Sequence, residues 1–333
     1  MLFNRSPLNI LIAFLRISLA AFLVWYLLCL FVPPGNGALV RDISFPAGSG
    51  IRGLSAQLKA GGIIRSSWHF ILLTRLRGQA HRLKAGDYRF NDGMTPAAVL
   101  AKIVAGDVDF RKFSLPEGYS IFQAAELLEQ KGYFKRQEFL DACREPEVLA
   151  KYGIAAESVE GYLYPATYNL SRNGNARQFI SQMVEQFLRR YEVVKASEKT
   201  SSGLSRHQIV TLASLIEKEA VSSEEKPLIS SVFHNRLRIG MPLQSDPTAV
   251  YGVRAFAGKV SKADIERHSP YNTYLIKGLP PGPIGNPGSD ALHAALNPAA
   301  SGYLYFVARQ DGTHHFSRTL DEHNRAVVRY LRN

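Results

Sequence analysis

Two glutamates near the end of one predicted helix are the strongest candidates for chemistry. Ser205 opens this helix with capping-box spacing, and apolar residues then repeat at the helical period over 209–220. At about 100° per residue, Glu217 falls inside or beside the apolar arc, whereas Glu219 lies about 200° further round, near the opposite edge. We therefore expect Glu217 to lie against apolar surface, Glu219 to lie away from it, and Lys218 to point outward.

Burial of Glu217 would suit acid catalysis. Removing a carboxylate from water disfavours its charged form and raises its pKa. A carboxyl group that is still protonated near neutral pH is what glycosidic cleavage needs to protonate the leaving oxygen. The alternative is structural, with Glu217 forming an ion pair with a nearby Arg or Lys at the edge of the helix. Spacing alone leaves both interpretations open.

Length and composition indicate an ordinary globular chain with an excess of positive charge. Its 333 residues are 46% hydrophobic and 20% charged, which excludes collagen-like, wholly disordered and polytopic membrane proteins. The formal net charge of +12 suits an anionic partner: nucleic acid, a membrane surface or an acidic polymer. Two cysteines, Cys29 and Cys143, support neither a disulfide scaffold nor a cysteine-based zinc site. We expect no metal and no cofactor.

The N-terminal segment predicts a membrane anchor. Residues 10–32 are almost entirely apolar and, at about 1.5 Å per residue, long enough to cross a hydrocarbon core of about 30 Å. Arg5 precedes this segment, which places residues 1–9 in the cytoplasm and the bulk of the chain beyond the inner membrane, in the periplasm. The alternative, a cleaved signal peptide, has a shorter apolar core and a small-residue cleavage site. An exported chain argues against a nucleic-acid partner.

A repeated pattern marks the first exported region, residues 41–145. Residues 43–48 recur as 113–118, and each copy predicts a short strand, a Pro-x-Gly turn and an amphipathic helix. Between the copies, residues 86–90 predict a strand and residues 94–104 a helix. The pattern resembles LysM, a small glycan-binding module. The alternative is a small α+β domain with a purely structural role, as a spacer and a packing unit.

Several motifs in a fixed order resemble those of one family. They are Ala-Ser-Leu-Ile-Glu-Lys-Glu at 213–219, Phe-His-Asn-Arg-Leu at 233–237, Leu-Gln-Ser-Asp-Pro-Thr at 243–248 and the loops of 271–287. Together they are similar to the YceG-like family of endolytic murein transglycosylases, over essentially the whole exported part. That family cleaves the MurNAc–GlcNAc bond inside nascent peptidoglycan strands and leaves a 1,6-anhydroMurNAc end. The resemblance implies that Glu217, which opens the E-K-E motif, is the catalytic acid/base.

One carboxylate is enough for that reaction. An ordinary glycoside hydrolase uses two, about 5–5.5 Å apart when retaining and about 6.5–9.5 Å when inverting. A lytic transglycosylase instead uses the sugar's own 6-hydroxyl as nucleophile, so Glu217 would protonate the leaving oxygen and then accept the 6-hydroxyl proton. Further residues are candidates for holding the substrate, namely Gln244, Ser245, Tyr271 and Asn272, with Asp246 and Glu160 either contacting it or organising loops.

The sequence thus predicts an α+β protein in three parts. These are a single transmembrane helix, a small LysM-like α+β domain and a mixed α/β catalytic domain over 146–333. Three tyrosines in 162–168 would line a carbohydrate cleft or fill a buried strand and turn. The expected partners are peptidoglycan glycan strands, the cytoplasmic membrane and, by resemblance, penicillin-binding proteins, with termination of glycan elongation as the expected role.

The sequence leaves two other functions open. A conventional muramidase would use Glu217 as acid and Asp246 or Glu160 as second carboxylate. A non-enzymatic peptidoglycan-binding scaffold would need no carboxyl chemistry at all. An aminodeoxychorismate lyase, a label that some relatives have carried, would require a pyridoxal-phosphate lysine in a cytosolic site, and an exported chain argues against both.

Overall fold

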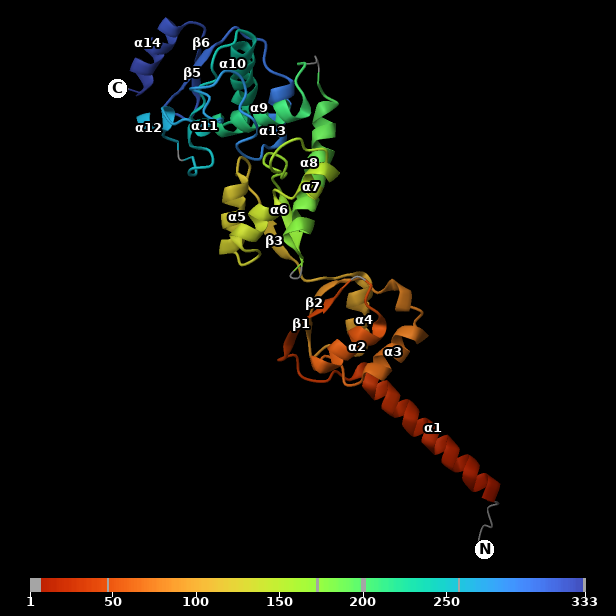
Figure 1. Ribbon diagram of the computed structural model, residues 1–333. Helices are drawn as coiled ribbons and strands as arrows, with labels where there is room; N and C mark the ends of the chain where they lie inside the picture. The colour runs from red at the N-terminus through yellow and green to blue at the C-terminus, as the bar shows by residue number, and fades with distance from the viewer. Residues whose placement is uncertain (1–6, 47, 172–173, 199–201, 257, 332–333) are drawn as a thin grey trace. The chain divides into compact units, whose positions relative to one another are not determined.

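Figure 1 presents the computed structural model, in which residues 7–46, 48–171, 174–198, 202–256 and 258–331 are described. Residues 1–6 of the expected cytoplasmic N-terminus and Ala47 of the first repeat copy lie outside the described residues. The chain packs as two compact units: unit 1 is Met1–Arg111 with Asn169–Asn173, and unit 2 is Lys112–Tyr168 with Gly174–Asn333. Helices combine with two-stranded sheets, so the predicted α+β class is confirmed.

The apolar N-terminal segment forms one helix, α1 (Pro7–Phe31). The 18-residue stretch Leu11–Leu28 of this helix has a mean hydropathy of 2.2, and none of it is buried inside the protein. Pro33 and Pro34 follow, and proline cannot continue a helix because it lacks the amide donor. By length and composition α1 is compatible with a single-pass membrane anchor.

Unit 1 packs three short helices on a two-stranded sheet. Strands β1 (Val40–Phe45) and β2 (Gly86–Asn91) are antiparallel, with Ile43 opposite Tyr88. The remaining elements are α2 (Ile51–Ala60), α3 (Ser67–Leu76), the short 3-10 helix η1 (Ala80–Arg82) and α4 (Pro96–Ala105). Thr95 caps α4 by accepting the amide of Ala98 at 3.2 Å. The predicted strand and helix between the repeat copies are therefore confirmed.

The two repeat copies have similar local structure but pack in different places. In the second copy, β3 (Arg111–Ser114) pairs with β4 (Thr167–Leu170), and a capping box at Ser120 begins α5 (Ile121–Gln130). Helix α2 of the first copy belongs to unit 1, whereas α5 belongs to unit 2. The packing thus divides the chain after Arg111, whereas the sequence predicts one domain over 41–145. The LysM-like character of that domain stays a prediction.

Unit 2 is built around one buried helix, α9 (Arg206–Glu219), against which α10 (Lys226–Arg238) and α13 (Ser289–Leu296) pack. Every residue from Ile209 to Ile216 is buried. The other elements are α6 (Arg136–Ala142), α7 (Pro146–Lys151), α8 (Ala176–Lys195), η2 (Ser223–Glu225), α11 (Asp246–Val250), α12 (Lys262–Ile265), the hairpin β5 (Tyr305–Ala308) and β6 (His314–Ser317), and α14 (Leu320–Leu331). Because α9 is enclosed all round, its apolar residues do not mark a single inner face.

Candidate active site

Glu217 is held in an ion pair. Its Oε1 lies 2.9 Å from Nζ of Lys226 at the start of α10, and the two side chains are only 8% and 5% exposed. Its Oε2 accepts the backbone N–H of Gly288 at 2.9 Å, at the N-terminus of α13, where a negative charge is favourable. The Glu217 side chain is thus enclosed, as expected, but its observed contacts are those of the structural alternative. A catalytic role of Glu217 stays a prediction.

A further carboxyl group, which the sequence did not indicate, lies beside this pair. Oε2 of Glu117 is 3.9 Å from Nζ of Lys226. Partial burial and the charge of Glu217 raise the pKa of Glu117, while Lys226 opposes the rise. A Cβ at Gly288 would lie 2.0 Å from a Glu117 oxygen, so a side chain there would displace the Glu117 carboxyl group.

Glu219, the last residue of α9, has a carboxyl group that lines a cavity. The cavity has a volume of about 750 Å³. Burial raises the pKa of Glu219 to about 7, although Ser245, whose hydroxyl donates to Oε1 at 2.5 Å, opposes the rise. The expected position of Glu219, away from apolar surface, is wrong because the loop before α11 and the β5–β6 hairpin enclose this end of the helix.

The loop before α11 is fixed at the cavity wall by hydrogen bonds. Gln244 has a φ of 47°, the only positive value among the described non-glycine residues, and such a conformation persists only where surrounding contacts impose it. Its amide donates to the carbonyl of Thr273 at 3.1 Å, and the amide of Ser245 donates to Oγ1 of Thr273 at 2.9 Å. Asp246 accepts the hydroxyl of Tyr274 at 2.5 Å instead of capping α11 with its side chain.

The structure thus brings three of the predicted substrate residues to one wall. Gln244 and Asp246 line the cavity of Glu219, and Ser245 binds the Glu219 carboxyl group directly. Tyr274, which the sequence motifs do not single out, lines the same cavity. It follows Asn272 closely in the chain, but only the fold brings its hydroxyl to Asp246.

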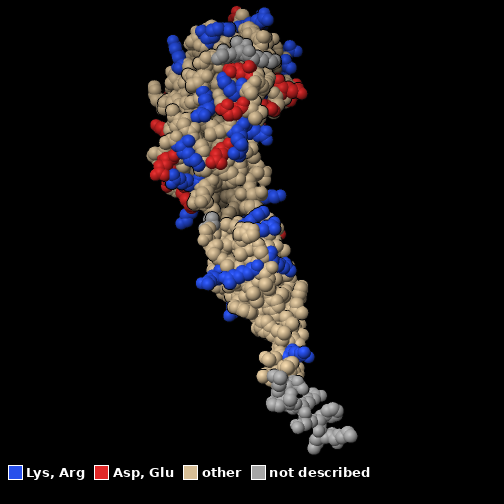
Figure 2. Space-filling view, turned by 90° about the vertical axis from the view of Figure 1, so that its right-hand side faces the viewer, with Lys and Arg blue, Asp and Glu red and all other residues tan. Residues whose placement is uncertain are grey.

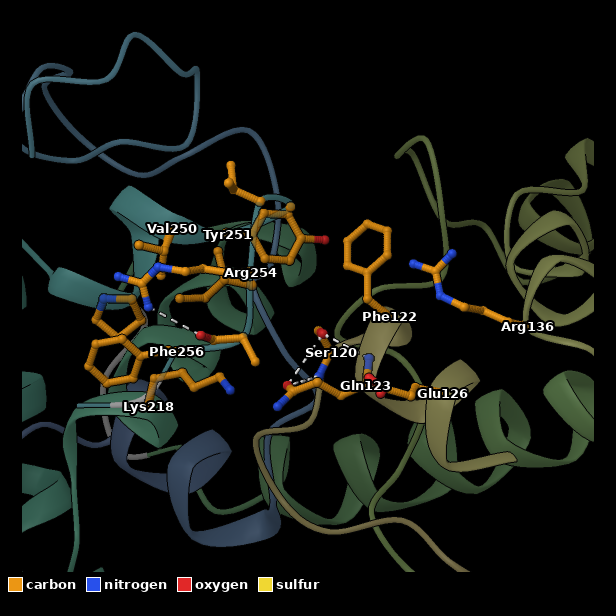
Figure 3. Close-up of a pocket in the computed structure, with 15 residues that line it drawn as sticks. Ser120, Phe122, Gln123, Glu126, Arg136, Lys218, Val250, Tyr251, Arg254 and Phe256 are labelled. Atoms are coloured by element: carbon orange, nitrogen blue, oxygen red, sulfur yellow. Dashed lines mark hydrogen bonds between the residues drawn. The ribbon is translucent and has the colours of Figure 1, made fainter. Parts of the chain in front are cut away.

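A second cavity, of about 240 Å³, shares Lys218 and Phe256 with the first. Figure 3 shows its aromatic wall, where Phe122 of α5 and Tyr251 after α11 lie beside each other with ring centroids 5.9 Å apart. Lys218 was expected to point outward but lines both cavities, and burial lowers its pKa. Aromatic faces with a few convergent polar groups are typical of ligand sites.

Glu160 and Tyr271 lie apart from Glu219, in a third cavity of about 400 Å³. Burial raises the pKa of Glu160 to about 7, and its hydrogen bonds oppose the rise. It accepts the amide of Ile121 at 3.0 Å and the hydroxyl of Tyr251 at 2.9 Å. These contacts fix the start of α5, so the loop-organising interpretation of Glu160 agrees with its surroundings.

Asn272 is wholly buried and holds a loop together. Its Nδ2 donates to the carbonyls of Ile265 and Arg267, each at 2.8 Å. The tyrosine-rich segment is also internal, with Tyr162 and Tyr168 buried. The structure thus favours the buried strand and turn over a carbohydrate cleft there. Among the described residues, no group of three His, Cys, Asp or Glu side chains is placed to hold a metal ion.

In this α+β fold, a carboxyl group of raised pKa lines a cavity that adjoins aromatic side chains, which makes this end of unit 2 a candidate acid–base site. Comparison with known proteins identifies its relatives. The YceG-like family model matches residues 43–329, and the chain belongs to this family. It is 34% identical over 306 residues to the endolytic murein transglycosylase of Bacillus subtilis (strain 168), covering 87% of this chain and 84% of that protein.

Two further relatives agree with this assignment. The endolytic murein transglycosylase of Streptococcus pneumoniae (strain ATCC BAA-255 / R6) is 29% identical over 328 residues, which cover 89% of this chain and 59% of that protein. A crystal structure of a yceG-like protein from Listeria monocytogenes superposes with a TM-score of 0.58 at 34% identity, covering 86% of this chain and 99% of that one.

Proposed function

We propose that this chain is a membrane-anchored lytic transglycosylase that cleaves the MurNAc–GlcNAc bond within nascent peptidoglycan strands. The family and the names of its relatives support the enzyme class and the peptidoglycan substrate. Helix α1 would anchor the enzyme in the inner membrane with the two units in the periplasm. Cleavage beside penicillin-binding proteins would end glycan elongation.

The observation that carries the mechanism is the carboxyl group of Glu219, which lines the cavity and has a raised pKa. With a pKa of about 7 it holds a proton near neutral pH, which a general acid must do. Glu219 donates this proton to the glycosidic oxygen as the bond from C1 of MurNAc breaks. The Glu219 carboxylate then accepts the proton of the 6-hydroxyl while O6 bonds to C1, which restores the acid and forms the 1,6-anhydro ring.

Glu219 suits this role better than Glu217, the residue that the family resemblance implies. The Glu217 carboxylate is engaged by an ammonium group and a backbone amide and lines none of the cavities described above. Glu219 faces the largest of these cavities and has one hydroxyl donor, Ser245, that orients it. We assign Glu217 to joining the ends of α9, α10 and α13.

The cavity wall supplies the groups that hold the sugar. Gln244 presents an amide from a strained and fixed backbone, and Asp246 presents a carboxylate oriented by Tyr274. The adjoining cavity, with Phe122 and Phe256, would accept the next sugar along the strand. Fixed polar groups of this kind reduce the cost of ordering the site in the transition state.

The test is cleavage of uncrosslinked glycan strands by the full-length chain in detergent, with mass spectrometry of the new ends. Wild type, Glu219→Gln, Glu217→Gln and a control, Glu224→Gln at an exposed position in η2, are compared. We expect anhydro ends from every form except Glu219→Gln. Loss of cleavage only in Glu217→Gln would instead establish the residue that the sequence implied.

The same measurement separates the other functions. Reducing ends from wild type would indicate a muramidase, with Asp246 as the next residue to replace because it lines the same cavity as Glu219. Absence of cleavage by wild type, with retained binding to the strands, would indicate a peptidoglycan-binding scaffold.

A further inference from the structure

Helix α3 of unit 1 begins beside the last two turns of α1 rather than beyond its end. The ring of His69 contacts those of Trp25 and Tyr26, with centroids 4.4 Å and 5.8 Å apart. Trp25 lies six residues before Phe31, the last residue of α1, which is about 9 Å along the helix axis. If α1 spans the bilayer, the start of α3 therefore lies within the depth of the outer leaflet.

The outward face of α3 carries three large apolar residues, with Arg75 beside them near its C-terminal end. Trp68, Leu72 and Leu76 follow at helical spacing, and Trp68 and Leu76 are 55% and 69% exposed. The opposite face carries Phe70 and Leu73, which are buried in the core of unit 1. A helix that is apolar on both sides is typical of an element with core on one side and lipid on the other.

Polar atoms at this junction lack protein partners. Both ring nitrogens of His69 and the hydroxyl of Tyr26 are buried without a hydrogen bond to any described residue. Burial lowers the pKa of His69, which favours the neutral ring. Trp25, Tyr26 and Trp68 are also the residue types that gather at membrane interfaces, where one end of the ring meets apolar chains and the other meets head groups.

Positive charge surrounds the same helix. Arg65, Arg75 and Arg77 are exposed at its two ends, and the guanidinium of Arg65 donates to the carbonyl of Pro33, just after α1, at 3.1 Å. In Figure 2, the visible face of unit 1 carries Lys and Arg with hardly any Asp or Glu, whereas unit 2 shows both signs. Basic residues next to a membrane span attract anionic head groups.

We propose that α3 is a second membrane contact, which embeds Trp68, Leu72 and Leu76 among the lipids of the leaflet that α1 enters and binds anionic phospholipid head groups through Arg75 and Arg77. The occupant is lipid because the apolar face continues directly from α1, and because the flanking charge complements anionic head groups. This contact rests on the anchoring role of α1 proposed above. It would fix unit 1 at the membrane surface instead of leaving it on a free tether.

Tryptophan fluorescence tests the proposal, because the chain has only two tryptophans, Trp25 and Trp68. The full-length chain is reconstituted in vesicles of phosphatidylcholine and phosphatidylglycerol that carry bromines at defined depths of the acyl chains. Trp25→Phe leaves Trp68 as the only reporter, and we expect shallow bromines to quench it most. Quenching by acrylamide from the water phase should be weak.

The matched variant Trp68→Phe reports on α1 alone and separates the two proposals. Quenching of Trp25 without quenching of Trp68 would overturn the α3 contact and leave the anchor intact. Absence of quenching at both positions would overturn the anchor as well. Trp68 that is shielded from acrylamide but not quenched by bromine would be covered by protein, which also overturns the contact.

The charge contribution has its own control. Arg75→Gln with Arg77→Gln, in the Trp25→Phe background, should abolish the gain in Trp68 quenching as phosphatidylglycerol replaces phosphatidylcholine. Lys131→Gln with Lys135→Gln, two exposed charges of unit 2, should leave that gain unchanged. An equal effect of both pairs would show that net charge alone is responsible and would overturn the assignment to α3.

Discussion

Replacing Glu219 with glutamine should stabilise unit 2 in alkaline solution while abolishing cleavage. The native carboxyl group keeps its proton up to about pH 7, whereas the unfolded chain loses it near the ordinary pKa of 4.5. The folded state therefore binds more protons between these values, and its stability falls as the pH rises through this window. At about 1.4 kcal/mol per pKa unit, the shift corresponds to about 3 kcal/mol of lost stability by about pH 8.

Glutamine at this position cannot ionise and still offers an oxygen to Ser245. The variant therefore does not lose folding stability as the pH rises. We expect Glu219→Gln to be about 3 kcal/mol more stable than wild type at about pH 8, but less than about 1 kcal/mol more stable at about pH 5. Its cleavage rate should fall by about 10²–10⁴-fold, the usual contribution of a general acid. Stability and activity thus change in opposite directions.

Cys143 provides the assay, because its thiol is fully buried in unit 2 and both tryptophans lie in unit 1. Its labelling by a dipyridyl disulfide, which reacts with thiols even in acid, is followed by peptide mass spectrometry in moderate urea. At about pH 8, wild type should label about 100-fold faster than the variant, since about 1.4 kcal/mol corresponds to a factor of ten. A ratio that does not change with pH would refute the assignment of a raised pKa to Glu219.

Three other predictions concern the groups around this carboxyl. Ser245→Ala removes the hydrogen bond that lowers the pKa of Glu219, so the alkaline limb of the pH–rate profile should move to higher pH. Lys226→Met leaves the buried carboxylate of Glu217 without its ammonium partner and should cost about 3–5 kcal/mol in urea unfolding, whereas the double variant with Glu217→Gln should recover much of the loss. Glu160→Ala leaves buried donors without an acceptor and should cost about 1–3 kcal/mol for each, while Glu160→Gln, which keeps an acceptor oxygen, should cost less in the same assay.

Local sequence patterns were enough to predict most helices and strands of the fold. The capping boxes at Ser120 and Ser205, the proline at the first position of α4 and the apolar run of α1 each act within a few residues of the chain. Such signals depend on backbone hydrogen bonds and side-chain spacing close in sequence. The grouping of the two repeat copies into separate units depends instead on contacts between residues far apart, which the repeat itself does not encode.

For the candidate site, too, the sequence determined one part and the tertiary structure another. The sequence by itself located the E-K-E segment, the Gln244–Asp246 loop and the family, because motif order and residue type are properties of the chain alone. Only the tertiary structure decided that Glu217 forms an ion pair and that Glu219 lines a cavity. Helix α9 is enclosed on every side, so helical spacing cannot tell an inner face from an outer one. Lys226 at the start of α10 and the amide of Gly288, just before α13, bind Glu217, and Ser245 in the loop before α11 donates to Glu219.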